Sequence, residues 1–176
     1  YLMMQYDLIA DDEKNETYRL WIEQYVGALT DTIYLLADPN YKNPENDFSV
    51  AQRIELLEKS LSIFEIVYGE NLLSVNREFY EINRVIAGLQ LLEKQYEAAL
   101  DKLEKAAEYA IAFDAYKDGD SYTSLMLYGI SADEHGLWDE KTTDDMLHRL
   151  TSQSRYECLK NNVRYENIIK KLSKGS

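Results

Sequence analysis

Two histidines and one cysteine are the residues of this chain best suited to metal binding or nucleophilic catalysis: His135, His148 and Cys158. They lack the short spacings of a zinc site, and a Cys–His nucleophile pair would require residues that meet in space. His135 lies among four carboxylates, as a weak divalent-metal site would require. His148 follows two aspartates by about one helical turn, which favours a solvated His–carboxylate pair. Cys158 stands in an apolar stripe and is predicted to be a buried structural thiol.

The segment from Asp114 to Gly119 (D-A-Y-K-D-G) begins like a calcium-binding loop, in which carboxylates surround the ion and a glycine makes the turn. Its third position is Tyr116, and its twelfth, where a bidentate glutamate is needed, is Leu125. We therefore predict an ordinary turn. Glycine-rich phosphate loops, G-x-S-x-G and H-E-x-x-H do not occur in the sequence. The chain is predicted to be no enzyme and to need no metal or cofactor.

Composition indicates the kind of fold that must position such residues. The chain has 176 residues, with 19 basic and 32 acidic groups that give a net charge of −13. Its length suits one domain, and only 7 glycines and 2 prolines are too few for a many-stranded β protein. An apolar run of about 20 residues, as a membrane span needs, is absent from the sequence. We expect an all-α, cytoplasmic protein with no membrane contact.

Apolar residues recur at steps of three and four, so the elements are predicted to be helices. Ser49 is the expected N-cap of the second helix, and Gly69 is expected to end it. We expect one domain over 1–176, with a helical array at about 1–113 and a smaller helical part at about 121–172. The predicted helical segments are Glu13–Ala37, 50–68, a helix ending near Leu92, Tyr96–Ala110, Asp144–Leu150 and Arg155–Leu172.

Each predicted helix has an apolar set that we expect to face the core. The first is Tyr18, Trp21/Ile22, Tyr25, Leu29, Ile33 and Leu36; the second is Ile54, Leu57, Leu61, Phe64 and Tyr68. The central pair uses Phe79, Ile82, Ile86, Leu89 and Leu92, then Tyr96, Ala99, Leu103, Ala106 and Ala110. The last stretch uses Tyr156, Leu159, Val163, Ile168/Ile169 and Leu172. The small residues of the fourth helix allow close approach, which predicts an antiparallel hairpin with the third.

The segment from Asn83 to Ala106 is the strongest internal pattern. Ala99, Leu103 and Ala106 fit the second helix of the tetratricopeptide (TPR) signature, whereas Asn83 and Gln90 replace its large aromatic residues. An earlier, degenerate unit is visible at Arg53–Ser60. Its Ser60 precedes the corresponding residue, Ala106, by 46 positions, whereas regular TPR units repeat every 34 residues. The pattern predicts TPR-like antiparallel helical hairpins with irregular repeats, followed by short C-terminal helices. A generic helical bundle is the alternative.

Several segments together resemble the C-terminal helical region of bacterial Cro/repressor-type (Xre-like) helix-turn-helix transcription regulators. They are NETYRLW at 15–21, RIELLEKSLSIF at 53–64, YEAALDKLEKAAEYAIAFD at 96–114, YTSLML at 122–127 and the closing stretch 155–172. The family's DNA-reading module is absent from this chain. The resemblance implies a regulatory or oligomerising half, with DNA contact left to a helix-turn-helix domain upstream of Tyr1.

TPR-like arrays usually bind through the first helix of each pair, which would put Glu81, Arg84 and Gly88 on the partner groove. Arg84 is the leading candidate, because its planar guanidinium can hold a carboxylate. We expect a protein-interaction or dimerisation domain with a protein or peptide partner and a possible homodimer. The alternatives are a sensor of a peptide or small molecule in the helical groove and a free-standing TPR-like adaptor.

The charge is unevenly distributed along the chain. Residues 1–148 carry 12 basic and 30 acidic groups, whereas residues 149–176 carry 7 basic and 2 acidic groups. The first interpretation is a basic last helix that docks on an acidic array and complements its own C-terminal dipole. The second is a small phosphate-contacting patch within 149–176. The acidic remainder argues against direct contact with nucleic acid.

Overall fold

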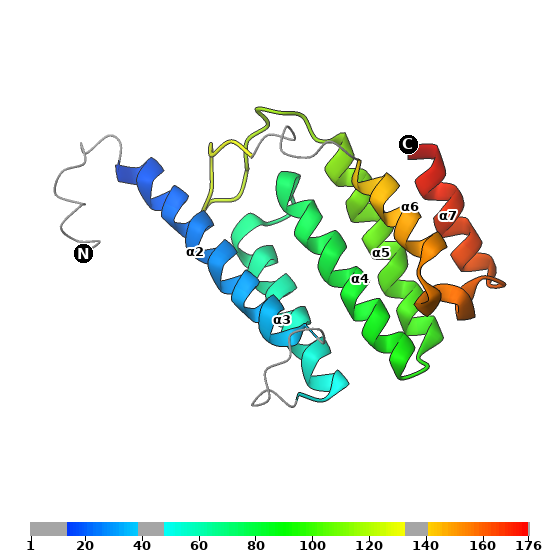
Figure 1. The fold of residues 1–176 in the computed structure, drawn as a ribbon. Coiled ribbons are helices and arrows are strands. Elements are labelled where there is room, and N and C mark those ends of the chain that lie inside the picture. The colour runs from blue at the N-terminus through cyan, green and yellow to red at the C-terminus, as the bar shows by residue number, and fades with distance from the viewer. Residues whose placement is uncertain (1–13, 39–47, 133–140, 176) are drawn as a thin grey trace.

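The fold is all-α, as predicted. The computed structural model describes residues 14–38, 48–132 and 141–175 (Figure 1). Within those residues the only β pairing is one antiparallel bridge between Ser121 and Ser131. The helices are α2 Lys14–Ala37, α3 Val50–Tyr68, α4 Asn76–Leu92, α5 Tyr96–Ala115, α6 Thr142–Ser152 and α7 Val163–Gly175, with 3₁₀ turns at Leu73–Val75 and Ser154–Leu159.

The ends of α3 follow from local chemistry. Ser49 and Gln52 form a reciprocal capping box: the Gln52 amide donates to Ser49 Oγ (3.3 Å), and the Ser49 amide donates to Gln52 Oε1 (2.9 Å). These bonds satisfy amides that a helix start leaves without intrahelical partners. Gly69 ends the helix at φ 67°, a conformation that favours glycine, while its amide bonds the Glu65 carbonyl. Both predicted ends are confirmed.

Helices α4 and α5 form the tightest hairpin of the fold. Ala99, Ala106 and Ala110 are fully buried, as predicted, so the two backbones approach closely. The two residues nearest the connecting turn are corrections to the predicted core: Leu92 is 68% exposed and Tyr96 is 42% exposed. Both lie where the helices end at the turn, so no facing helix covers them. The TPR-like repeat itself stays a prediction.

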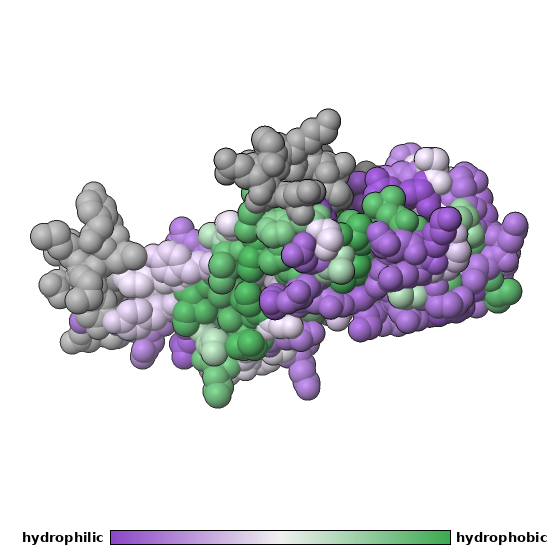
Figure 2. Space-filling view, turned by 90° about the horizontal axis from the view of Figure 1, so that it is seen from below, coloured by the Kyte–Doolittle hydropathy of each residue, from purple (hydrophilic) through white to green (hydrophobic). Residues whose placement is uncertain are grey.

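Helix α2 also departs from its predicted burial. Tyr25 and Leu29, which the periodicity assigns to the core, are each about half exposed. Ile22 packs against the core as predicted, and it is joined there by Val26 and Tyr34, which are not in the predicted set. Apolar residues therefore occupy two sides of this helix, and periodicity alone cannot say which side is covered. Figure 2 shows hydrophobic residues gathered over the half that holds α2 and α3, whereas hydrophilic residues cover the half that holds α5 to α7.

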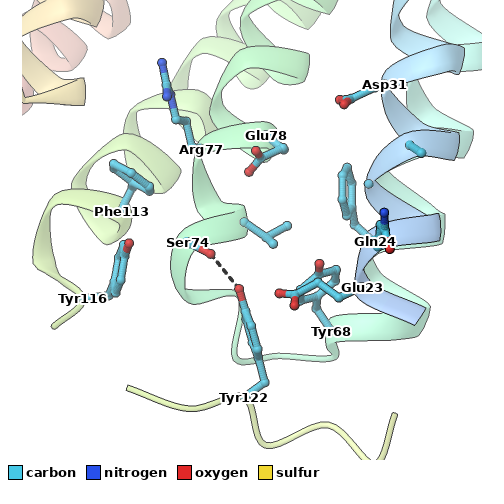
Figure 3. A pocket seen from close by; sticks show the side chains of 14 residues that line it. Glu23, Gln24, Asp31, Tyr68, Ser74, Arg77, Glu78, Phe113, Tyr116 and Tyr122 are labelled. Atoms are coloured by element: carbon cyan, nitrogen blue, oxygen red, sulfur yellow. Dashed lines mark hydrogen bonds between the residues drawn. The ribbon is translucent and has the colours of Figure 1, made fainter. Parts of the chain in front are cut away.

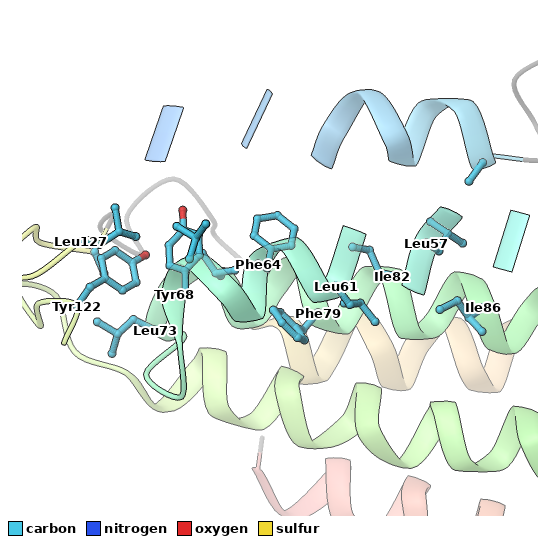
Figure 4. Close-up of a cluster of buried hydrophobic side chains, with 14 of the residues drawn as sticks. Leu57, Leu61, Phe64, Tyr68, Leu73, Phe79, Ile82, Ile86, Tyr122 and Leu127 are labelled. Atoms are coloured by element: carbon cyan, nitrogen blue, oxygen red, sulfur yellow. The ribbon is translucent and has the colours of Figure 1, made fainter. Parts of the chain in front are cut away.

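The core has two parts that meet at α4. One part joins α2, α3, α4 and the segment around Tyr122 and Leu127 (Figure 4). The other joins α4 and α5 to α6, the 3₁₀ turn Ser154–Leu159 and α7. Phe79 of α4 packs into the first part, and Tyr80, the next residue, packs into the second. Helix α4 is therefore buried on two sides.

The predicted single stretch 155–172 is broken. The 3₁₀ turn Ser154–Leu159 precedes α7, which begins at Val163. The break changes the helical phase, so Val163 is 70% exposed and Cys158 is an exposed free thiol. Both predictions of burial are wrong, while Tyr156 and Leu159 are buried as expected.

Helix α7 docks on α5 through ion pairs, as the first interpretation of the basic C-terminal segment predicts. Arg164 contacts three carboxylates of α5: Asp101 at 2.6 Å, Glu104 at 2.7 Å and Glu97 at 2.9 Å. Lys171 adds a fourth contact, at 3.1 Å, to Glu108. The hydrogen bond from Arg164 is the main reason that the pKa of Glu104 lies below its ordinary value.

Candidate functional site

A groove runs between α2 and α4. It consists of three adjoining cavities of about 460, 380 and 570 Å³. The first two share Asp31 and Glu78, and the second and third share Tyr34. Because neighbouring cavities have wall residues in common, we treat them as one continuous groove. Its walls come from first helices of successive pairs, α2 and α4, and α6 joins them at one end.

Helical spacing places the wall residues on one side of each helix. On α2 these residues include Glu23, Gly27, Asp31 and Tyr34, at steps of three or four, and Asp38 follows directly after the helix. Residues at such steps share a helix face. The corresponding face of α4 carries, in order, Arg77, Glu78, Glu81, Arg84, Val85 and Gly88.

One end of the groove, which we call the acidic end, combines carboxylates with aromatic rings. Its carboxylates are Glu23 and Asp31 of α2 and Glu78 and Glu81 of α4, with Arg77 as the one guanidinium among the lining residues. Figure 3 shows Glu23 and Asp31 on α2 and Glu78 on α4, across the cavity. The aromatic lining is Phe64, Tyr68, Phe113, Tyr116 and Tyr122.

Packing and hydrogen bonds hold the aromatic rings of the acidic end. The Tyr68 and Tyr122 rings meet edge to face with centroids 5.0 Å apart, and those of Phe113 and Tyr116 do so at 5.4 Å. The Tyr122 hydroxyl shares a 2.6 Å hydrogen bond with Ser74 Oγ (Figure 3). Such contacts orient rings before any ligand arrives. The segment after α5 is thus tied to the 3₁₀ turn that precedes α4.

The other end, which we call the arginine end, is lined by Arg84, Arg149 and Arg155, with Asp38 as the one carboxylate among its lining residues. Arg84 is only 9% exposed and forms a salt bridge with Glu81; its Nε donates to Glu81 Oε2 at 3.1 Å. Burial works to lower the pKa of Arg84, but the Glu81 carboxylate outweighs it, and the pKa is raised. Arg84 therefore stays charged at any physiological pH.

Arg149 is also paired. Its Nε donates to Asp145 Oδ2 at 2.7 Å, and the Tyr80 hydroxyl donates to the same oxygen at 2.8 Å. Burial works to raise the pKa of Asp145, but the hydrogen bonds from Arg149 and Tyr80 outweigh it, and the pKa lies below its ordinary value. Asp145 is thus the ionised partner of Arg149.

Gly88 makes room for the third arginine. A Cβ built on Gly88 would lie 3.3 Å from Nη1 of Arg155, so the Arg155 side chain passes directly over this glycine. Glycine inside a helix costs about 1 kcal/mol relative to alanine. The free space at Gly88 lets the guanidinium of an exposed residue on the 3₁₀ turn lie against α4.

The three residues proposed from the sequence lie on this groove. Glu81 lines its middle cavity, and Arg84 and Gly88 line the arginine end. Whether they contact a ligand stays a prediction. Sequence reasoning missed Arg149 and Arg155, because they come from later elements and only the tertiary fold brings them to α4. The α2 wall does carry a signal in the sequence, namely polar residues at helical spacing beside an apolar stripe.

The other candidate residues do not converge on this groove. The Asp114 carboxylate, the first position of the calcium-like segment, accepts the backbone amides of Thr142 (2.9 Å) and Thr143 (3.0 Å). It therefore caps the start of α6. His148 is exposed, and its neighbour Asp145 bonds Arg149 and Tyr80 instead.

His135 lies outside the described residues. Within them, groups of three or more His, Cys, Asp or Glu side chains that could hold a metal ion are absent. In the same part of the chain, every helix falls short of the length and apolarity that crossing a membrane requires.

Comparisons with protein-family models, with curated proteins and with solved structures found no match for this chain. The groove therefore has to be interpreted from its own chemistry. The likeness to Xre-like regulators remains a prediction from sequence.

Proposed function

We propose that this chain is a non-catalytic interaction module that holds a peptide segment of a partner protein in the groove between α2 and α4. The observation that carries the proposal is the groove itself, three adjoining cavities walled by α2 and α4 and closed at one end by α6 and the following 3₁₀ turn. An elongated groove with aromatic and charged walls suits an extended chain, because it offers both apolar surface and hydrogen-bonding groups along its length.

The charged residues of the arginine end support binding rather than proton transfer. An efficient general acid or base has a pKa near the working pH. Here the pKa values are shifted away from neutral pH, since the pKa of Arg84 is raised and that of Asp145 is lowered. Both groups therefore keep their charges near neutral pH, as a recognition site needs.

The resemblance to Xre-like regulators supports a regulatory setting for this module. In that setting it is the regulatory half of a bacterial cytoplasmic transcription regulator, and a helix-turn-helix domain outside this chain reads DNA. A small-molecule sensor that uses the same groove is the alternative, as is a free-standing TPR-like adaptor. In each case the groove between α2 and α4 is where the signal or partner enters.

A groove-filling substitution tests the proposal. A phage-displayed random peptide library is selected on the full chain, and the affinities of the selected peptides are measured by fluorescence anisotropy. Gly27 lines the groove, and a Cβ added there meets no atom within 4 Å, so Gly27→Phe fills the groove without a clash at the backbone. We expect at least about tenfold weaker binding, which corresponds to about 1.4 kcal/mol.

Thr32→Phe is the matched control, because Thr32 is exposed on the same helix and does not line the groove. Its peptide affinities should equal those of the unsubstituted chain. Peptides that bind Gly27→Phe as tightly as the original chain would show that they bind elsewhere, and the proposal would be wrong. A library that yields no binder would also contradict it.

A second candidate function, homodimerisation, is supported by the exposed apolar side of α2. Tyr25 and Leu29 are 49% and 50% exposed, and they lie at equal distances along the chain on either side of Gly27. Tyr18 and Leu36 form a second such pair, centred on the same residue. A two-fold axis at that point would set each residue of a pair against the other in a second copy. Light scattering over a range of concentrations should show a dimer that Leu29→Lys abolishes. A concentration-independent monomer would rule this function out.

A further inference from the structure

The two ends of the groove carry opposite charge. The acidic end has four carboxylates and one guanidinium among its lining residues, and the arginine end has three guanidiniums and one carboxylate. The ends are joined by the Arg84–Glu81 salt bridge, since Glu81 lines the middle cavity and Arg84 the last. A ligand that spans the groove therefore meets a change of sign along its length.

The acidic end has the chemistry that recognises an alkylammonium or guanidinium group. A cation is attracted to the faces of aromatic rings, where electron density is highest, and nearby carboxylates add direct charge attraction. Here the rings of Phe64, Tyr116 and Tyr122 line the same cavity as Glu23 and Asp31. The apolar stem of a lysine or arginine could pack on the rings while its charged head meets a carboxylate.

The arginine end has a donor that has no partner among the described residues. Arg84 and Arg149 are neutralised by Glu81 and Asp145. Arg155 is exposed, and in the described part of the chain no carboxylate pairs with it. Its guanidinium lies beside Gly88, where it lines the cavity. A planar guanidinium with free N–H groups is suited to a carboxylate.

Gln153 gives an independent indication that something binds at the arginine end. Its side chain lines the same cavity, and its Oε1 is buried without a hydrogen-bond donor in the described residues. Such a buried acceptor is costly to leave without a donor. A backbone N–H of a bound peptide would supply the missing donor once the Gln153 amide turns towards the cavity.

We propose that the groove binds its peptide in one direction, with a lysine or arginine side chain at the acidic end and a carboxylate at Arg155. The carboxylate is either an aspartate or glutamate side chain or the peptide's own C-terminus. This inference rests on the proposed peptide-binding function and adds to it the charge pattern and the orientation of the ligand. Charge complementarity of this kind fixes register and excludes wrong partners more than it raises affinity.

Charge reversals at the two ends test the inference. The probe is a phage-displayed random library of peptides of about twelve residues, which span ~40 Å when extended. The full chain should select peptides with a basic residue and a carboxylate held at a constant separation. Asp31→Lys should remove the preference for the basic residue, and Arg155→Glu should remove the preference for the carboxylate. Each should weaken the original peptides about tenfold or more.

Glu65→Lys is the matched control, since it changes the net charge as Asp31→Lys does but lies exposed on α3, outside the groove. It should leave both the sequence preferences of the selected peptides and their affinities unchanged. If peptides bind in a way that Gly27→Phe disrupts but Asp31→Lys and Arg155→Glu do not alter, the orientation is wrong and the peptide-binding function stands. If Gly27→Phe has no effect, the peptide-binding function itself has failed.

Carboxyl-terminal amidation of a selected peptide separates the two sources of the carboxylate. A loss of affinity on amidation identifies the C-terminus as the group at Arg155, and the Arg155→Glu variant should no longer respond to amidation. An unchanged affinity assigns the contact to an acidic side chain, whose replacement by asparagine or glutamine should then weaken binding. If neither change weakens binding, no carboxylate is held there and the inference is overturned.

Discussion

The two walls of the groove are anchored very differently. Helix α4 buries twelve of its 17 residues, while α2 buries only Thr30 and Ala37 of its 24. The difference arises because α4 lies between both parts of the core, whereas α2 contacts only one of them, mainly through α3. One wall is therefore fixed by packing on two sides, and the other is held on one side. A ligand in this groove would gain most of its positional precision from α4 and could draw α2 towards it.

The largest expected effect separates the helix pair α4–α5 from α2. Leu103 of α5 is fully buried, whereas Leu29 of α2 is 50% exposed. Leu103→Ala should lower the free energy of unfolding by about 2–5 kcal/mol, because it leaves a cavity in a packed core. Leu29→Ala should lower it by less than about 0.5 kcal/mol. Urea unfolding measures both free energies, and equal costs would remove the distinction between the α4–α5 pair and α2.

Hydrogen exchange should show the same difference without any substitution. Regions with few buried contacts open more easily than regions packed on two sides. Amides in the middle of α2 should therefore exchange at least about tenfold faster than those of α4, a difference of about 1.4 kcal/mol. Exchange followed by mass spectrometry resolves the two helices. Equal protection would mean that α2 is held by contacts other than those described.

The ion pairs between α5 and α7 sharpen the comparison at the opposite edge of the fold. Arg164→Ala removes contacts to three carboxylates, and we expect a loss of about 1 kcal/mol that shrinks at high salt. Lys170→Ala is the control, because Lys170 contacts Glu166 of its own helix, at 3.9 Å, rather than α5. A control as costly as Arg164→Ala would show that general charge, not docking, is responsible.

The same ion pairs predict a response to acid. Because the pKa of Glu104 is lowered in the folded protein, its stabilisation is complete above the unfolded value of about 4.5. It is lost as the pH falls through the lower folded pKa. Unfolding free energies of the unsubstituted chain and of Arg164→Ala, measured from pH 7 to about pH 3, should converge at the acid end. Parallel curves would contradict this linkage.

The smallest expected effect compares two helical glycines, one on each wall. A Cβ on Gly27 of α2 meets nothing within 4 Å, whereas one on Gly88 of α4 lies 3.3 Å from the Arg155 guanidinium. Gly27→Ala should raise the unfolding free energy by about 0.5–1 kcal/mol through helix propensity alone. Gly88→Ala should raise the unfolding free energy by less, because the Arg155 side chain must move to make room for the added methyl group. Thermal unfolding measures both, and a larger gain at Gly88 would mean that Arg155 is not held there.

Local signals in the sequence predict the helices well. The capping box at Ser49 and the positive φ of Gly69 depend on residues within one turn, so their effect can be read without knowledge of the rest of the fold. Burial is harder to predict, as Tyr25 and Cys158 show. Periodicity identifies an apolar side of a helix but not the element that covers it, and a break near Lys160 changes which residues face inward.

The groove could be predicted only in part, for the same physical reason. Arg84 and Gly88 can be selected because they share a face of one predicted helix. Asp31 and Arg155 lie on the other walls and are separated from α4 by long stretches of chain, so their distance from it cannot be judged from residue spacing. The opposite charge of the two ends is a property of the tertiary fold alone.

The carboxylate of Asp114 joins the end of α5 to the start of α6, at residues 28 and 29 positions further along the chain. Both ends of this long connection are therefore fixed to each other. The entropy cost of lengthening such a closed connection grows only slowly, by ~0.6 kcal/mol for each doubling. A longer connection between these two fixed ends would therefore cost the fold little free energy, and Asp114 is the residue on which that tolerance depends.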